Sequence, residues 1–173
     1  MSILVAAIVT GLATLIAACT VPDDPTLAPE DQFDFWVGEW ECSGKSRTTP
    51  GKDEWQDTKA TNSVTKELGG KVVEENFTMG SFIGKSVSVY DKNRKIWRQT
   101  WVDSSGGYLV FEGGMQGEKM VLTKVTGPNE GDVRQRMVFS EIDDDSFVWD
   151  WERSTDRGKT WELSWKLNYK RIK

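Results

Sequence analysis

From about residue 37 to the C-terminus, turn signals recur about every ten to fifteen residues, and the runs between them are rich in Val, Thr, Trp, Phe and Tyr. Consecutive strands joined by such short turns can pair only as antiparallel neighbours, and a long meander leaves two exposed edges unless the sheet closes. The sequence therefore predicts an all-β fold, a single antiparallel up-and-down β-barrel of about ten strands. The expected strands are about 37–46, 54–67, 71–79, 85–91, 95–103, 108–113, 118–126, 132–142, 146–154 and 160–171.

The last two expected strands alternate between apolar and polar side chains, which gives each strand an inner and an outer face. A two-sheet sandwich would show the same alternation and is the alternative architecture. The residues expected to face inward are Phe147, Trp149 and Trp151 in one strand and Trp161, Leu163, Trp165, Leu167 and Tyr169 in the other.

The stretch 33–40 (FDFWVGEW) contains four aromatic residues just before the first strand. We expect a short helical turn here that plugs one end of the barrel with Phe33, Phe35 and Trp36, while Trp40 points inward. The alternative is an amphipathic helix end packed on some other core. Arg171 falls on one of the inward-facing positions of the alternating last strand and is expected to lie over the Trp40 ring.

The N-terminus has the pattern of a lipoprotein signal peptide. An apolar run from Ile3 to Ala18 ends in the sequence IAAC, with small residues before Cys19. This predicts a signal peptide over 1–18, a lipidated, Pro-rich flexible tether over 19–30 that starts at Cys19, and a barrel domain over 31–173. No Lys or Arg precedes the run, and an uncleaved anchor helix is the alternative, although the run is short for a span.

Charge and composition exclude several function classes. The net charge is −5 without a basic block, which argues against nucleic acid and leaves acyl chains as the expected contact with a membrane. The sequence has no His, which removes Ser-His-Asp and Cys-His catalysis, His-ligated haem and the usual zinc sites. We expect no cofactor and no metal. Asp143 to Asp145 form either a solvated turn or, less simply, a calcium cluster. Cys42 is either a buried inert thiol or a reactive one.

The inward faces of the middle strands predict an apolar cavity with a few polar groups, as in sites for small amphipathic molecules. Glu74 and Glu75 are adjacent, so only one of them can face the interior. The alternative is that the aromatic side chains simply fill the barrel. The expected cavity residues are Trp97, Gln99, Trp101, Leu109, Phe111, Met137, Phe139, Trp149 and Trp151.

Several short motifs, in order, resemble those of a known superfamily. Gly38-Glu39-Trp40 near the mature N-terminus, with a basic residue closing the last strand, resembles the calycin signature of lipocalins and their relatives. FDFWVGEWE at 33–41, WVDS at 101–104, STDRGKTW at 154–161 and YKR at 169–171 resemble an uncharacterised bacterial lipocalin-like family that has only a domain-of-unknown-function label. The resemblance implies a barrel and transfers no catalytic residue. Structural roles are expected for Gly38, Trp40, Arg171, Asp156, Gly158 and Trp161.

Residues 154–161 also match the Asp-box pattern of sialidases and other propellers. Propellers need several copies, whereas this sequence has one, so we interpret it as a stable hairpin in which Asp156 accepts hydrogen bonds from turn amides.

Three hypotheses for function follow. The first is a cell-envelope lipoprotein that binds or carries a small hydrophobic or amphipathic ligand in the barrel. Its expected place is the outer membrane, facing the periplasm, because Thr20 rather than an acid follows Cys19, as in enterobacterial lipoproteins sorted there. The second is an enzyme that uses an interior carboxylate beside an Arg. The third is an envelope scaffold with a filled barrel and an exposed apolar patch, for which Phe82 and Ile83 are candidates, as they are for a lid.

Overall fold

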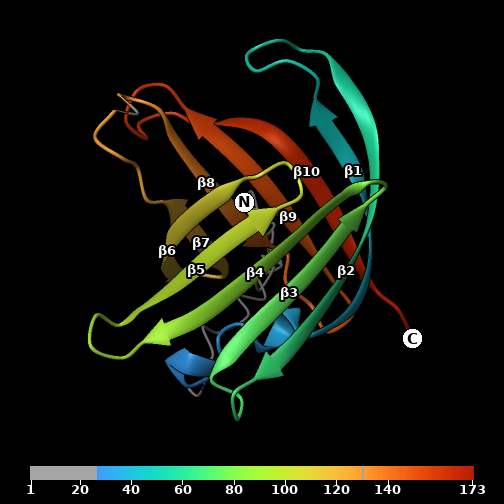
Figure 1. Cartoon of the computed structure of the whole chain (residues 1–173), viewed down its shortest axis with the longest axis vertical. Helices are drawn as coiled ribbons and strands as arrows, with labels where there is room; N and C mark the ends of the chain where they lie inside the picture. The colour runs from blue at the N-terminus through green and yellow to red at the C-terminus, as the bar shows by residue number, and fades with distance from the viewer. Residues whose placement is uncertain (1–26, 130) are drawn as a thin grey trace, which may run out of the picture.

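Ten strands close into one antiparallel barrel in the computed structural model, which describes residues 27–129 and 131–173 (Figure 1). Each strand pairs with its neighbour in sequence, and β1 pairs with β10 to close the sheet. The predicted all-β barrel is therefore confirmed, and closure rules out the sandwich alternative. The strands are β1 (Gly38–Arg47), β2 (Trp55–Glu67), β3 (Val72–Met79), β4 (Phe82–Asp91), β5 (Ile96–Asp103), β6 (Tyr108–Gln116), β7 (Lys119–Lys124), β8 (Arg134–Ser140), β9 (Ser146–Ser154) and β10 (Glu162–Arg171).

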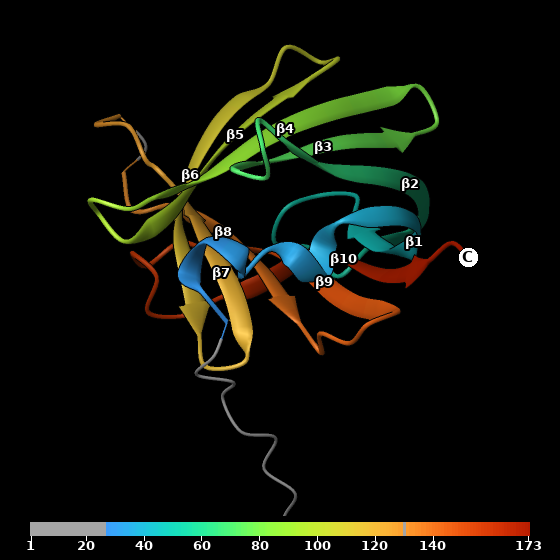
Figure 2. The ribbon, with the colours of Figure 1, turned by 90° about the horizontal axis from the view of Figure 1, so that it is seen from below.

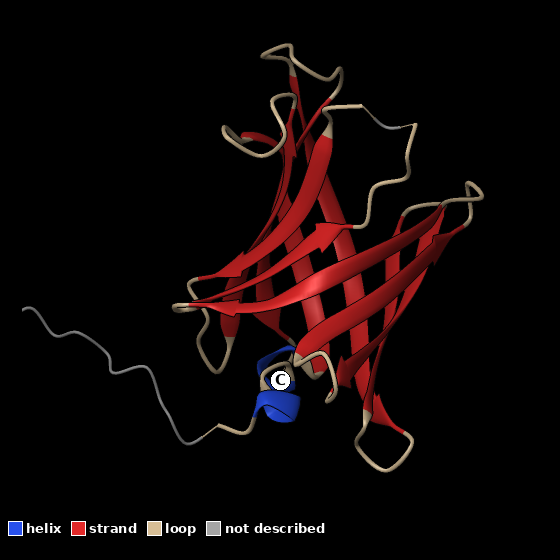
Figure 3. Cartoon of the chain, turned by 90° about the vertical axis from the view of Figure 1, so that its left-hand side faces the viewer, coloured by secondary structure: helices blue, strands red, loops and turns tan. Residues whose placement is uncertain are grey.

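Two short 3-10 turns, η1 (Pro29–Asp31) and η2 (Asp34–Trp36), lie across one end of the barrel (Figures 2 and 3). We call residues 29–36 the plug. The Phe33 ring packs edge-on against Trp97, with centroids 4.8 Å apart, and is fully buried. Phe35 packs edge-on against Phe147 at 5.5 Å. The predicted aromatic plug is thus present, and the strands supply the rings that it packs on.

The two ends of the barrel sequence meet beside the plug. The Arg171 Cζ lies 4.1 Å from the centroid of the Trp40 ring, which is the stacking expected from strand parity. Arg171 also donates from Nη1 to the Val37 carbonyl at 2.7 Å and from Nη2 to the Phe35 carbonyl at 3.2 Å. Gly38 has φ 141°, and a Cβ there would collide with the guanidinium, so the contact needs glycine. Arg171 therefore ties the last strand to the plug.

The segment Gly80 to Gly84 is not the loop that the sequence suggested. The turn is confined to Gly80 and Ser81, and β4 already begins at Phe82, which pairs with Met79. Phe82 faces the interior, where its ring is stacked on Trp101. Ile83 points outward and is 56% exposed. Gly84 lies inside β4, where its missing side chain leaves space for the Trp101 indole.

The inward parity expected for Trp161 is wrong. A register shift interrupts the pairing of β9 and β10 between Leu163 and Trp165, so the simple alternation does not extend back to Trp161. Trp161 instead lies under the Arg136 guanidinium, with the Arg136 Cζ 4.0 Å from its ring centroid. Arg136 is on the outer face of β8 and pairs with Glu152 at 2.5 Å, which places Trp161 outside the barrel.

The hairpin between β9 and β10 is organised by Asp156. Its carboxylate accepts hydrogen bonds from the amides of Lys159 at 3.0 Å and Thr160 at 2.9 Å and from the Ser154 hydroxyl at 2.7 Å. The Thr160 amide and these other donors hold the pKa of Asp156 well below its usual range. This is the local turn chemistry predicted for the single Asp-box match.

The predicted signal peptide, the predicted lipidation site Cys19 and most of the predicted tether lie outside the described residues. Within 27–129 and 131–173, none of the helices has the length and apolarity required to cross a bilayer.

A candidate ligand-binding cavity

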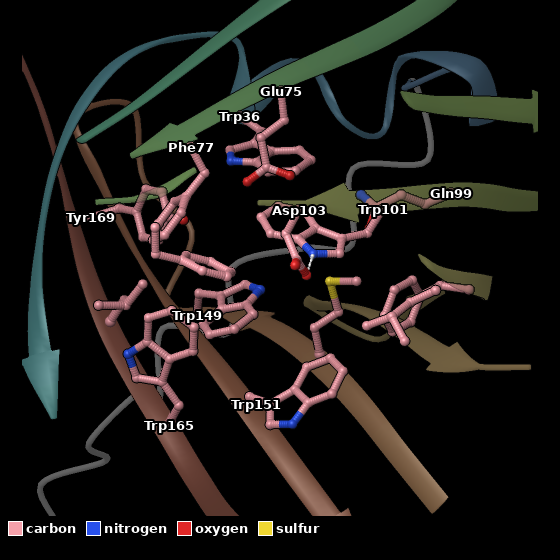
Figure 4. Close-up of a pocket in the computed structure, with 15 residues that line it drawn as sticks. Trp36, Glu75, Phe77, Gln99, Trp101, Asp103, Trp149, Trp151, Trp165 and Tyr169 are labelled. Carbon is pink, nitrogen blue, oxygen red and sulfur yellow. Dashed lines mark hydrogen bonds between the residues drawn. The ribbon is translucent and has the colours of Figure 1, made fainter. Parts of the chain in front are cut away.

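The barrel encloses a cavity of about 250 Å³ on the inner side of the plug (Figure 4). One end of the cavity is closed by the plug residue Trp36. The other end reaches the turns at 80–81 and 104–107, which lie side by side because the Ser104 amide donates to the Ile83 carbonyl at 2.8 Å. We call this end the mouth. The lining residues are Trp36, Glu75, Phe77, Phe82, Gln99, Trp101, Asp103, Leu109, Phe111, Met137, Trp149, Trp151, Trp165, Leu167 and Tyr169.

Most of the residues expected at the cavity lie on its wall, but two of them do not. The ones on the wall are Gln99, Trp101, Leu109, Phe111, Met137, Trp149 and Trp151. Trp97 and Phe139 face inward too, yet they lie at the level of the plug. Phe33 packs on both rings, at 4.8 Å and 5.6 Å, and the Trp97 indole donates to the Pro29 carbonyl at 3.1 Å. The plug therefore covers both residues and separates them from the cavity.

Glu75 is the buried carboxyl of the cavity wall, at 6% exposure. Asn62 Nδ2 donates to Oε1 at 2.7 Å, and Ser86 Oγ donates to Oε2 at 2.6 Å. Burial raises the pKa of the Glu75 carboxyl to about 7, because desolvation outweighs the stabilisation of the charged form by these two donors. Its neighbour Glu74 points outward and pairs with Lys85 at 2.8 Å, so Glu75 is the interior member of the pair.

A short polar network extends from Glu75 toward β1 and β10. The same Asn62 amide donates to the Tyr169 hydroxyl at 3.1 Å, and Tyr169 lies opposite Cys42 in the pairing of β10 with β1. Burial raises the pKa of Cys42 to about 12, so the thiol stays protonated at neutral pH. Cys42 is therefore the inert buried thiol of the two possibilities that the sequence left open.

Aromatic side chains form the walls toward the mouth. Trp149 packs edge-on against Trp165 at 5.2 Å and is stacked on Trp151 at 6.2 Å. The four tryptophans of this region, Trp101, Trp149, Trp151 and Trp165, are only partly buried. Because partly exposed rings line both the cavity and its rim, the cavity is accessible to solvent at the mouth.

Asp103 lies at the mouth and is fixed by its own turn. It accepts hydrogen bonds from the Trp101 indole at 2.9 Å and from the amides of Ser105 at 2.9 Å and Gly107 at 3.0 Å. The Trp101 indole and these amides lower the pKa of Asp103 below its usual value. The carboxylate thus orients the Trp101 ring across the cavity wall.

A family profile described as "Protein of unknown function (DUF1579)" matches residues 28–171, which include the plug and all ten strands. The chain belongs to the DUF1579 family. A search of curated proteins finds no match.

The cavity of this DUF1579 chain contains residues that the sequence did not assign to it. Tyr169, Trp165 and Leu167 were expected to face inward, and their strand parity was sufficient to place them at the wall. Phe77 lies two residues after Glu75 in β3, so the same alternation could have placed it there. Besides Tyr169, Trp165 and Leu167, the lining residues outside the expected cavity set are Trp36, Phe77, Phe82 and Asp103.

The wall of the DUF1579 cavity has carboxyl groups but no cationic side chain. Of the described residues that line it, Glu75 and Asp103 are acidic, and none is Lys or Arg. The described residues also contain no group of three or more His, Cys, Asp or Glu side chains positioned to hold a metal ion. The cavity therefore offers apolar contact, hydrogen bonding and one buried acid.

Proposed function

We propose that the protein binds and carries a small hydrophobic or amphipathic molecule in the barrel cavity, and that it does so as a lipocalin-like lipoprotein of the cell envelope. The observation that supports this most directly is a hollow, aromatic-lined interior with one isolated buried carboxyl, Glu75. Ligand sites for small molecules have this composition, with an apolar surface for affinity and few polar groups for orientation.

The geometry beside the plug supports a relation to the calycins. In the motif to which the sequence is similar, a Gly-x-Trp unit lies at the start of the first strand and a basic residue at the end of the last. Here Gly38, Trp40 and Arg171 occupy those positions and are in contact. Lipidation at Cys19 and a position at the outer membrane facing the periplasm rest on the sequence pattern and belong to the same proposal.

Native mass spectrometry of the full-length chain purified from its own host, combined with organic extraction, tests carriage. We expect a stoichiometric co-purified molecule that is lost when cavity rings are removed in Trp149→Ala and Trp101→Ala. Both variants should remain folded because these side chains are partly exposed at the wall of a hollow space. A clean apo mass that does not shift against a lipid extract would contradict the proposal.

The burial of the Glu75 carboxyl at the cavity wall supports an enzyme as a second candidate. A carboxyl with a pKa of about 7 in an apolar cavity can act as a general acid or base near neutral pH. The hypothesis that we drew from the sequence also needed an Arg beside this carboxyl, and no described Arg lines the cavity. Carriage is therefore the better supported function. Turnover of a co-purified molecule that disappears in Glu75→Gln would favour the enzyme instead.

The scaffold hypothesis assumed a barrel filled by its own side chains. The cavity counts against that form of the hypothesis, because the interior holds a cavity of about 250 Å³.

A further inference from the structure

The charges on the cavity wall restrict the polar group that a ligand can carry. Glu75 is buried there, and the described lining residues include no Lys or Arg to neutralise an acid. A ligand carboxylate near Glu75 would place two like charges together in an apolar space, and each would disfavour ionisation of the other. An anionic amphiphile such as a fatty acid is therefore a poor match for the cavity.

The hydrogen bonds at Glu75 also weaken the case for a cationic ligand. Both carboxylate oxygens already accept a hydrogen bond, from Asn62 and Ser86. Transfer of an ammonium group from water to an apolar cavity is costly, and a single carboxylate that already accepts two hydrogen bonds offsets this cost only partly. An uncharged polar group avoids that cost and can still donate to a remaining Glu75 lone pair.

Trp36 supplies an independent observation at the same end of the cavity. Its indole Nε1–H is buried and has no hydrogen-bond partner among the described residues, although the ring lines the cavity. A buried donor without a partner is costly, and such groups often mark the position of a ligand or water. Figure 4 draws Trp36 and Glu75 on the same side of the cavity. A hydroxyl group can donate to one of these residues and accept from the other, whereas an ammonium can only donate.

Toward the mouth the cavity wall is made mainly of aromatic rings, and the carboxylate there, Asp103, already accepts hydrogen bonds from the Trp101 indole and from two turn amides. Figure 4 draws Trp151 and Trp165 on the far side of the cavity from Glu75. We infer that the cavity takes an uncharged apolar molecule with a single hydroxyl, which lies between Glu75 and Trp36, and that it discriminates against the carboxylic acid of the same skeleton. This inference rests on the proposed carrier function and names the chemical class of the carried molecule.

Competition with three probes of equal chain length tests the inference. Decanol, decanoate and decylamine would each compete with the uncharged fluorescent probe N-phenylnaphthylamine for the full-length chain at about pH 8, where the acid is ionised and the amine is protonated. We expect decanol to bind best, with affinity for decanoate lower by at least about tenfold, because of the uncompensated charge at Glu75. Decanoate or decylamine binding as tightly as decanol would overturn the inference.

Two variants test the assigned contacts. Glu75→Gln removes the charge and should reduce the preference for decanol over decanoate to about threefold or less. Glu74→Gln is the matched control, because this neighbouring carboxyl faces outward and pairs with Lys85; the preference should not change. Trp36→Phe keeps a ring but removes the N–H, so affinity for decanol should fall while affinity for the hydrocarbon decane is retained. An unchanged preference in Glu75→Gln would also overturn the inference.

The same experiment separates the two levels of the proposal. Failure of the naphthylamine probe and of all three competitors to bind the folded chain would contradict carriage itself, and the inference with it. Binding of the probe without discrimination between alcohol and acid would leave carriage supported and overturn only the inference about the hydroxyl. Circular dichroism and urea midpoints of each variant establish that the compared proteins are folded.

Discussion

The plug end and the mouth end of the barrel are both built from aromatic side chains, yet the first is filled and the second is hollow. At the plug, Phe33, Trp40 and Phe139 are completely buried. Toward the mouth, Trp149 and Trp151 remain partly exposed around the cavity. The difference comes from the segment 29–36, which enters one end and supplies the rings that the strands alone lack. Aromatic content does not determine whether a barrel interior is packed; a segment that crosses it does.

The largest expected effect tests the filled end. Trp40→Ala should lower the free energy of unfolding by about 4 kcal/mol, because a large buried ring is removed from a tightly packed region. The Arg171 guanidinium that stacks on this ring would lose its partner as well. Urea unfolding followed by circular dichroism measures the change. A cost below that of removing a cavity tryptophan would contradict the distinction between the two ends.

The second prediction concerns the buried acid between the two ends. The unfolded chain ionises Glu75 near its usual pKa of 4.5, whereas the folded protein retains the proton up to about pH 7. The folded protein therefore holds this proton more tightly than the unfolded chain does. The resulting stabilisation is fully present below the unfolded pKa of 4.5 and is lost as the pH rises through the folded pKa of about 7. Relative to the unmodified protein, Glu75→Gln should gain about 3 kcal/mol between about pH 4 and about pH 8.

Urea unfolding of both proteins across this pH range gives that difference, in which the other titrating groups cancel. A stability difference that stays constant with pH would show that Glu75 does not titrate in this window.

The third prediction tests how the plug is held. Arg171→Lys keeps the charge but loses the planar fork that donates to the Val37 and Phe35 carbonyls. We expect a loss of about 2 kcal/mol from the broken hydrogen bonds and the lost stacking. Lys170→Arg is the control, since Lys170 is an exposed cation on the same strand and should tolerate the change. Equal unfolding midpoints for Arg171→Lys and the unmodified protein would contradict a structural role for Arg171.

The smallest effect on stability is expected at the hollow end. Trp151→Ala should cost only about 1 kcal/mol, because the ring is partly exposed and borders empty space rather than packed atoms. The affinity of the Trp151→Ala variant for the naphthylamine probe should nevertheless fall several-fold, since part of the cavity wall is lost. Comparison of Trp151→Ala with Trp40→Ala separates the effect of a ring on stability from its effect on ligand binding. A large loss of stability without a change in probe affinity would show that Trp151 belongs to the core.

The sequence was sufficient to predict the barrel because period-two alternation and short turns are local signals. Trp40 and Arg171 were also correctly paired, since both lie at strand ends and share the inward parity. Trp97 and Phe139 show the limit of parity. It indicates that a side chain points inward, but not its level along the barrel axis, which depends on strand tilt and on the register of distant strands.

Local irregularities account for the other differences. The register shift between Leu163 and Trp165 moves Trp161 to the outside, and no local signal in the sequence marks it. Gly84 looked like part of a loop, whereas it is a strand residue that accommodates the Trp101 ring. Whether the interior is hollow depends on how all these side chains fit together. The sequence alone therefore could not decide between a filled barrel and a hollow one.

The position of the plug has a consequence for how a cargo would be exchanged. The described chain begins at the plug end, where the Pro29 carbonyl accepts from Trp97 and Glu30 pairs with Lys92 at 2.6 Å. The turns that form the mouth, between β3 and β4 and between β5 and β6, lie at the opposite end of the barrel (Figure 1). We therefore propose that, in a lipid-anchored form, the anchor joins the barrel at its closed end and cargo is exchanged through the mouth, at the end remote from that attachment.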